Sequence, residues 1–354
     1  MRNAVLDGRE FEQIQILRDR PSEAVAVVVV HDTRLGPAFG GIRRHAYRTF
    51  DEGLEDALRL AEAMSWKCAL AGVKGGGAKT VIFDSEELDR VRAYELIGAY
   101  VEEMGGRYYT GPDVGTEEAD LESVARKTQY VARAVEEGPG PLGEPTARGV
   151  LAGVRAVAKR LDFSELEGLD VVVQGLGAVG ARLVRDLVAE GAKVRVTDVA
   201  QDRVKKAVEE HGVESIEPGE AAQAKCDVFC PCAFGGIVHD ISLSSLGARA
   251  IVGSANNVLA SPEHGDVLYS RGILYAPDFV VNAGALIHGA TFHLEGKAPA
   301  PERIDQIGDV VGDLLDEAHA TGIPPERLAV QRARRMIETS QSEPFLPRKG
   351  TDAN

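Results

Sequence analysis

A glycine-rich turn between a short apolar stretch and a helix-like stretch constrains the fold of this chain more than any other feature. The segment VVVQGLGAVGARLVRDLV places Gly175, Gly177 and Gly180 in a G-x-G-x-x-G pattern. The first glycine allows a tight turn, the second lets a pyrophosphate approach the backbone, and the third lets the following helix pack close to its strand. The helix N-terminus adds a field that favours the anion. The pattern predicts a dinucleotide site on a strand–turn–helix unit.

The acidic residue after the next expected strand completes the pattern. Asp198 follows a strand expected over residues 193–197, where a carboxylate accepts hydrogen bonds from both hydroxyls of a ribose. A 2′-phosphate would meet a like charge there, so Asp198 favours NAD over NADP. Leu176, Ala178 and Val179 are expected to line the site with the three glycines. The alternative is an ordinary glycine-rich turn with a capping aspartate.

The length of the chain and a proline- and glycine-rich stretch near residue 140 predict two domains. A chain of 354 residues is too long for one comfortable hydrophobic core, and the proline- and glycine-rich stretch Glu136–Pro145 marks a boundary. Strands alternate with helices on both sides, which indicates the α/β class. We expect an α/β substrate-binding and catalytic domain over 1–140, a Rossmann-type doubly wound parallel sheet over 141–325, and a cleft between them. Residues 326–354 are expected to form a C-terminal helix and tail that pack back on the first domain.

Charge and apolar content exclude several classes of partner. The net charge is −15 and no basic cluster is present, which argues against nucleic acid. The longest aliphatic run, Ala24–Val30, is too short to span a bilayer, and no secretory signal is visible, so we expect a cytoplasmic protein with no membrane partner. Cys226, Cys230 and Cys232 lack the spacing of a zinc site. We expect them to be small buried residues, with no metal bound.

The segment KCALAGVKGGGAKTVI, residues 67–82, combines three lysines with a run of three glycines. We expect Lys67 and Lys79 to lie on either side of a glycine-rich turn. One ammonium would bind a substrate carboxylate, and the second, desolvated beside the first, would have a pKa lowered toward neutrality and act as a base. Asp113, on a glycine-flanked loop, is a candidate catalytic carboxylate. Spacing alone leaves equally open a set of solvated lysines and an ordinary turn aspartate.

Motifs distributed over nearly the whole chain carry a family resemblance. In order, they are GPAFGGIRR, KCALAGVKGGGAKTVIFD, YYTGPDVGT, EPTARGV, VVVQGLGAVG, DVFCPCAFGG, IVGSANNVL and YAPDFVVNAGALIH. The chain therefore resembles the amino-acid dehydrogenases that act on leucine, valine and phenylalanine, which are relatives of glutamate dehydrogenase.

The resemblance implies NAD-dependent, reversible oxidative deamination of an apolar L-amino acid, leucine, phenylalanine or valine, to the 2-oxo acid and ammonium. It also implies a homo-oligomer. One alternative is a glutamate dehydrogenase, and another is an NAD-binding regulatory protein without catalysis. The joint presence of Lys67, Lys79 and Asp113 argues against the regulatory protein, since a decayed site would lose one of them.

Residue roles come from the resemblance, position by position. It implies that Lys67 binds the substrate carboxylate, Lys79 activates water as a general base, and Asp113 exchanges protons with the substrate nitrogen. The other implied substrate-binding residues are Phe39, Gly40, Gly41, Gly111, Pro112, Asn257, Leu286 and Gly289, and the other implied cofactor-binding residues are Thr146, Cys232, Ala233 and Asn256.

Two departures from the relatives bear on substrate choice. Phe39 and Gly289 stand where glutamate dehydrogenases carry a lysine and a serine that bind the substrate's side-chain carboxylate, so we expect glutamate to be rejected. Gly75 stands where the family has an apolar residue, and Ala78 directly precedes Lys79. Two outcomes remain open for the substrate pocket. The missing side chains of Gly75 and Gly289 leave volume that favours phenylalanine alongside leucine, or the ring of Phe39 fills that volume.

Overall fold

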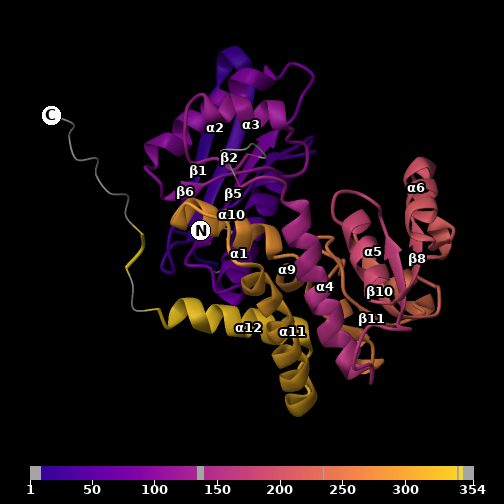
Figure 1. Ribbon diagram of the computed structural model, residues 1–354. Coiled ribbons are helices and arrows are strands. Elements are labelled where there is room, and N and C mark those ends of the chain that lie inside the picture. Colours follow the sequence, from indigo (N-terminus) through magenta and orange to yellow (C-terminus); the bar gives the residue numbers. More distant parts are fainter. Residues whose placement is uncertain (1–8, 134–138, 234, 341–342, 346–354) are drawn as a thin grey trace. The chain divides into compact units, whose positions relative to one another are not determined.

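The computed structural model describes residues 9–133, 139–233, 235–340 and 343–345 (Figure 1). The chain forms two compact units. The first comprises Met1–Gly140, Gly289–Lys297 and Ala333–Asn354, and the second comprises Pro141–His288 and Ala298–Arg332. Two helices, α10 (Gly284–Glu295) and α12 (Pro325–Glu338), contribute residues to both units.

The first unit is built around one sheet with helices on both faces. Its remaining elements are β1 (Gln13–Asp19), η1 (Arg20–Ser22), β2 (Ala24–Asp32), β3 (Ala38–Phe39), β4 (Ile42–His45), α1 (Phe50–Leu70), β5 (Gly76–Phe83), α2 (Arg90–Glu103), β6 (Tyr108–Tyr109) and α3 (Glu118–Ala125). The strand order is β1-β2-β5-β3-β6, with β4 also paired to β5. The pairs β1–β2 and β2–β5 are antiparallel and the others parallel, so this sheet is mixed.

Strand β2 shows why both faces of this sheet are covered. Successive side chains of a strand point to opposite faces. Val27 and Val29 pack with α1, whereas Val28 and Val30 pack with the apolar residues of α2 and α3. The nearly continuous valine run therefore reflects burial on both sides. It makes this strand a rigid support for its neighbour β5.

The second unit contains the remaining elements. They are α4 (Gly143–Arg160), β7 (Asp170–Gln174), α5 (Gly180–Ala189), β8 (Lys193–Thr197), α6 (Gln201–His211), β9 (Glu214–Ser215), η2 (Pro218–Glu220), β10 (Cys226–Pro231), α7 (Asp240–Ser245), β11 (Ala248–Ile251), α8 (Glu263–Ser270), β12 (Leu274–Tyr275), α9 (Asp278–Val281) and α11 (Pro301–Thr321).

The sheet of the second unit is parallel throughout, in the order β12-β11-β10-β7-β8-β9. The chain moves outward from β7 through β8 to β9, then returns to the other side of β7 with β10. The carboxyl ends of β7 and β10 therefore flank the point where the order reverses, where ligands bind in open α/β sheets. The doubly wound Rossmann-type sheet expected from the glycine pattern is confirmed.

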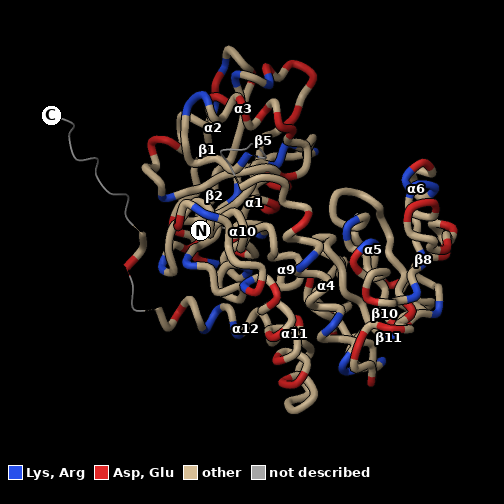
Figure 2. Tube along the Cα trace, in the orientation of Figure 1, with Lys and Arg blue, Asp and Glu red and all other residues tan. Residues whose placement is uncertain are grey.

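The strand expected over residues 193–197 is present as β8 (Lys193–Thr197), whereas several of the short strands give no signal of their own in the sequence. The strands β3, β4 and β9 have no clear periodic signal, because two to four residues give too few alternations, whereas β1 alternates polar and apolar residues at positions 13–16. Helix α6 is solvated on much of its surface and carries charges of both signs (Figure 2). Lys205 pairs with Glu209 and Lys206 with Glu210, each one helical turn apart. Within the described residues, no helix has the length and apolar character needed to cross a membrane.

Candidate active site

A buried lysine and a buried aspartate meet in the first unit. Lys79 lies in the middle of β5, and Asp113 lies in the loop between β6 and α3. The Lys79 Nζ atom is 2.8 Å from Oδ2 of Asp113, and the lysine side chain is only 6% exposed. Both sequence-predicted catalytic residues are thus brought together. A buried ion pair of this kind is costly to build, which marks it as a candidate for chemistry.

The glycine run before Lys79 is needed for close packing. A Cβ on Gly76 would lie 1.7 Å from the carbonyl oxygen of Asp32 in β2, and a Cβ on Gly77 would lie 2.2 Å from the amide nitrogen of Ser65 in α1. The expected glycine-containing turn lies between Lys67 and Lys79 at residues 71–75, with Gly72 and Gly75 in it, whereas Gly76 and Gly77 belong to strand β5. Their missing side chains let the strand fit between β2 and the backbone of α1.

Gly40 and Gly41 also allow close backbone packing, here next to the Lys79–Asp113 pair. A Cβ on Gly40 would lie 1.7 Å from the carbonyl oxygen of Ala78. A Cβ on Gly41 would lie 2.5 Å from the carbonyl oxygen of Pro112 and 3.0 Å from Cβ of Asp113. The two glycines therefore bring the β3–β4 connection against both the strand of Lys79 and the loop of Asp113.

Burial and a nearby guanidinium lower the pKa of Lys79. Desolvation of the charged amine is the largest cause, the Asp113 carboxylate opposes it, and the positive charge of Arg43 adds to it. The sequence points to Lys67 as the neighbouring cation, but the largest cationic contribution comes from Arg43. The pKa of Asp113 is lowered, because the charges of Lys79 and Arg43 outweigh its desolvation.

Arg43 and its partners form a network that sequence reasoning missed. Arg43 Nε donates to Oδ2 of Asp113 at 2.7 Å, and Nη1 donates to Oδ2 of Asp56 at 2.9 Å. The hydroxyl of Tyr47 donates to the same Asp56 oxygen at 2.6 Å, and Arg59 pairs with its other oxygen. The signal in the sequence is its place in the motif GPAFGGIRR, where Arg43 directly follows the apolar start of a short strand.

The other two lysines of the segment lie outside this pair. Lys67 is half-buried in the last turn of α1, the helix that packs on β5. Lys74 is exposed, between the end of α1 and the start of β5. Of the three lysines, only Lys79 is fully buried, and this separates a candidate base from a solvated side chain.

An aromatic cluster lies beside the lysine strand. The ring of Phe39, 5% exposed, stacks on Tyr109 with 5.3 Å between centroids, and His293 of α10 lies 5.1 Å from the same tyrosine ring. A Cβ on Gly75 would lie 2.7 Å from two carbons of Phe39, so the ring fills the space that this glycine leaves. Gly289 differs: it is buried, yet a Cβ there would meet no heavy atom within 4 Å.

Three further predicted residues extend this description. Gly111 is buried and directly follows the bridge at Thr110, with Ala132 as its nearest side-chain neighbour. Pro112 is exposed and pairs with Ile42 in an isolated bridge. Leu286 is half-buried on the part of α10 that belongs to the second unit.

The glycine turn of the second unit lies at the carboxyl end of β7. Gly175 has φ +96°, a backbone conformation that favours glycine, and a Cβ on Gly180 would lie 1.8 Å from its carbonyl oxygen. A Cβ on Gly177 would meet nothing within 4 Å, so the surface over the turn is open. Leu176, Ala178 and Val179 complete the turn, and α5 begins at Gly180. The geometry fits a bound pyrophosphate.

Asp198 directly follows β8 and is hydrogen-bonded to the backbone of the glycine turn. Its Oδ2 atom accepts a hydrogen bond from the amide of Leu176 at 2.6 Å, and Oδ1 accepts from the amide of Ala200 at 2.8 Å. These hydrogen bonds and the nearby charge of Arg203 outweigh desolvation and lower the pKa of the carboxyl. The guanidinium of Arg203 is 3.7 Å away. Asp198 thus carries a negative charge at the turn and also fixes its backbone.

The predicted Asn256 and Asn257 form a turn held from α9. Asn257 has φ +53°, and Asn256 Oδ1 accepts a hydrogen bond from Nδ2 of Asn282 at 2.8 Å. The amide of Val258 donates to Oδ2 of Asp278 at 2.7 Å. Sequence reasoning missed Asn282 and Asp278, although both are polar residues at the ends of the apolar stretch FVV.

Thr146, Cys232 and Ala233 lie in the same unit. Thr146 is buried in the first turn of α4, where its hydroxyl donates to the carbonyl of Leu142. Cys232 follows β10, its amide donates to the carbonyl of Gln174, and Ala233 is exposed. The cysteines are free, and burial raises the pKa of the Cys226 thiol to about 12. In the described part of the chain, no group of three or more metal-binding side chains is placed to hold an ion.

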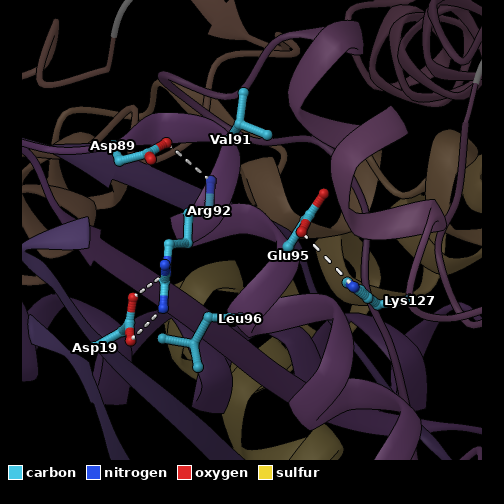
Figure 3. A pocket seen from close by; sticks show the side chains of 7 residues that line it. All are labelled: Asp19, Asp89, Val91, Arg92, Glu95, Leu96 and Lys127. Carbon is cyan, nitrogen blue, oxygen red and sulfur yellow. Dashed lines mark hydrogen bonds and ion pairs between the residues drawn. The ribbon is translucent and has the colours of Figure 1, made fainter. Parts of the chain in front are cut away.

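A shallow hollow in the first unit contains none of the predicted residues (Figure 3). Its charged groups pair with one another, since Arg92 pairs with Asp19 at 2.6 Å and Lys127 with Glu95 at 3.7 Å. The volume is about 460 Å³, but the hollow is open to solvent. We therefore place the candidate chemistry at Lys79 and Asp113.

Comparison with known proteins gives consistent results over the whole chain. The family model described as "Glu/Leu/Phe/Val dehydrogenase, dimerisation domain" matches residues 13–130, and "Glutamate/Leucine/Phenylalanine/Valine dehydrogenase" matches 194–291. A leucine dehydrogenase of Geobacillus stearothermophilus is 41% identical, over 96% of this chain and 95% of the relative. A phenylalanine dehydrogenase of Lysinibacillus sphaericus is 37% identical, over 94% and 90%. The crystal structure of L-tryptophan dehydrogenase from Nostoc punctiforme superposes with a TM-score of 0.82 at 33% identity, covering 95% of this chain and 98% of that one.

Proposed function

This chain belongs to the glutamate/leucine/phenylalanine/valine dehydrogenase family and is an amino-acid dehydrogenase, and from that premise we propose that it deaminates an apolar L-amino acid reversibly with NAD. The products are the 2-oxo acid and ammonium. The observation that carries the proposal is the buried pair of Lys79 and Asp113, a base of lowered pKa in contact with an ionised carboxylate.

The two side chains divide the proton transfers between them. A nicotinamide held by the second unit would supply the hydride acceptor for the substrate α-carbon, so that the substrate would become an imine. Lys79, in its neutral form, takes a proton from water as that water attacks the imine carbon. Asp113 takes a proton from the substrate ammonium before hydride loss and returns it to the nitrogen of the carbinolamine that the water forms. The carbon–nitrogen bond then breaks as the hydroxyl proton passes to the departing ammonia, which gives the 2-oxo acid and ammonium. Gly40 and Gly41 hold the backbone close enough to both groups to bind the substrate carboxylate together with Lys67.

The second unit fits a dinucleotide. The open surface over Gly177 and the N-terminus of α5 would hold the pyrophosphate, and Asp198 would accept the ribose hydroxyls. The other residues proposed to contact the cofactor are Leu176, Ala178, Val179, Thr146, Cys232, Ala233 and Asn256. The ionised Asp198 supports NAD over NADP.

Location and assembly complete the proposal. Four free cysteines, of which three are buried and Cys232 is half-buried, suit a reducing compartment, so we propose a cytoplasmic enzyme. The match to a family model described as a dimerisation domain supports a homo-oligomer.

The decisive experiment is NADH formation at alkaline pH with a panel of L-amino acids. We expect turnover with leucine, valine or phenylalanine. Turnover with glutamate alone would indicate a glutamate dehydrogenase. No turnover with any amino acid, by a protein that binds NADH, would indicate a regulatory protein.

Lys67→Ala is expected to act mainly on substrate binding. Loss of one charge-assisted contact to a carboxylate costs about 1.5–3 kcal/mol, which is roughly a 10–100-fold higher KM for the amino acid. Steady-state kinetics with Lys74→Ala as the control test this, because Lys74 is exposed in the same segment. An unchanged KM would remove Lys67 from the site.

Asp198→Ser is expected to lower the ratio of kcat/KM for NAD to that for NADP. The repulsion of a 2′-phosphate disappears, and Arg203, 3.7 Å from the carboxylate, is left to face it. We also expect weaker NAD binding, because the amide of Leu176 loses its acceptor. The control is Asp198→Glu, which keeps the charge. Equal use of both cofactors by the wild type would contradict the role of Asp198.

A further inference from the structure

The guanidinium of Arg43 lies between two carboxylates beside the candidate base. It donates to Asp113 at 2.7 Å and to Asp56 at 2.9 Å. The side chains of Arg43, Asp113 and Asp56 are 14%, 16% and 15% exposed, so water screens their charges weakly. Lys79 and Arg43 both contact the same oxygen of Asp113. Neither Arg43 nor Asp56 is needed to bind substrate in the proposed mechanism.

We propose that Arg43 is a positioning residue: it fixes Asp113 against Lys79, and its charge, moderated by Asp56, keeps the amine of Lys79 available as a base. The inference rests on the proposed function, because it assigns how the base of that reaction is maintained. Without Arg43, Lys79 would face the full charge of Asp113, and a carboxylate at 2.8 Å holds a lysine in its protonated form. Arg43 opposes that effect in two ways.

The first way is geometric and the second is electrostatic. Geometrically, Arg43 occupies one oxygen of Asp113 together with Lys79, so the carboxylate is shared between two cations. Electrostatically, the charge of Arg43 lowers the pKa of Lys79, and the charge of Asp56 raises it. Asp56 thus sets how much of the positive charge of Arg43 acts on the amine.

The other groups facing this cluster do not titrate in its place. Tyr47, between β4 and α1, donates to Asp56, and burial raises its pKa. Burial likewise raises the pKa of Tyr108 in β6 to about 12. Arg59 on α1 pairs with Asp56. The pKa of Asp113 is lowered. Among these groups, Lys79 is therefore the one expected to lose its proton between neutral and alkaline pH.

The test is the dependence of kcat/KM on pH for amino-acid oxidation, measured in Arg43→Gln and in Asp56→Asn. Activity rises with pH as the base loses its proton. Arg43→Gln removes a cation, so the midpoint of the rising limb should move up by about one pH unit. Asp56→Asn removes an anion, so the midpoint should move down by roughly half a unit or more. The substrate's own amine titrates identically with every variant, so the shifts belong to the enzyme.

Two further variants separate positioning from structural support. Arg43→Lys keeps the positive charge, so the midpoint of its rising limb should lie close to the wild-type midpoint. Its kcat should stay below the wild-type kcat, because lysine cannot contact both carboxylates as arginine does. Arg90→Gln is the matched control, because Arg90 forms a two-bond pair with Asp120 in the same unit, at 2.6 and 2.7 Å, without a contact to Lys79 or Asp113 in the described bonds. Its midpoint should equal that of the wild type.

The outcomes are distinguishable. Opposite shifts in Arg43→Gln and Asp56→Asn support the inference. A loss of kcat with unmoved midpoints, or shifts in the same direction, would overturn it and make Arg43 a structural residue. If Arg43→Gln does not fold, as judged by thermal unfolding, Asp56→Asn and Arg43→Lys decide alone. A wild type without turnover would instead refute the proposed function.

Discussion

Replacing Lys79 with alanine is expected to lower kcat by about 10²–10⁴-fold, the usual cost of removing a general base. NADH binding should remain nearly intact, because the glycine turn belongs to the other compact unit. The variant should also fold, since Asp113 keeps Arg43 as a partner at 2.7 Å and is not left as an unpaired buried charge. Single-turnover rates and NADH fluorescence titration would measure the two quantities separately.

The matched control for this prediction is Lys74→Ala. Lys74 lies in the same segment but is exposed, so its removal should leave kcat and KM unchanged. A Lys79→Ala variant that kept more than about half of the wild-type kcat would show that another group activates water.

Glutamate is expected to be a poorer substrate than leucine by roughly a thousandfold or more in kcat/KM. Phe39 stacks on Tyr109 and lies against Gly75. Its apolar ring occupies the position where, by the resemblance, glutamate dehydrogenases have a lysine that binds the substrate's side-chain carboxylate. Gly289 offers no side-chain hydroxyl. An unpaired carboxylate buried there costs at least several kcal/mol, and each ~1.4 kcal/mol is a factor of ten.

The comparison of glutamate with glutamine and methionine isolates the charge from the size. All three side chains are of similar length, so methionine should be accepted best, glutamine less well and glutamate least. Glutamate within tenfold of the best substrate would contradict the apolar wall. Phenylalanine belongs in the same series, because the open space at Gly289 favours a larger side chain while Phe39 fills the space at Gly75.

Much of the second unit can be predicted from sequence, because its signals are local. The turn Gly175–Gly180 and strand Lys193–Thr197 follow from residues within a few positions of each other. In the first unit, the same kind of reasoning correctly expects a turn between Lys67 and Lys79 but does not show that Gly76 and Gly77 belong to a strand. Gly76 and Gly77 are required because a Cβ at either position would clash with backbone atoms of β2 or α1, which come from distant parts of the chain. A glycine needed for close approach and one needed for a turn look alike in sequence.

The candidate site shows the same limit. The separate roles of Lys79 and Asp113 come from the family resemblance. Their direct contact was not predicted, because no local periodicity relates a strand interior to a distant loop. The cation with the largest effect on the base was given no role: Arg43 lies in the motif GPAFGGIRR, but nothing in that motif distinguishes it from Arg44. Tertiary packing, rather than spacing, determines which cation approaches the amine.

The unequal division of the chain into compact units affects how chimeras of this enzyme should be made. The first unit is encoded in three separate stretches, Met1–Gly140, Gly289–Lys297 and Ala333–Asn354. A recombinant gene that exchanges only the leading stretch would import Phe39 and Lys79 but retain the host's Gly289 and His293. The imported Phe39 and Tyr109 would then pack against the α10 residues of the recipient enzyme, which match a different set of pocket residues. Transfer of substrate preference between relatives therefore requires the stretch Gly289–Lys297 to move together with the leading stretch.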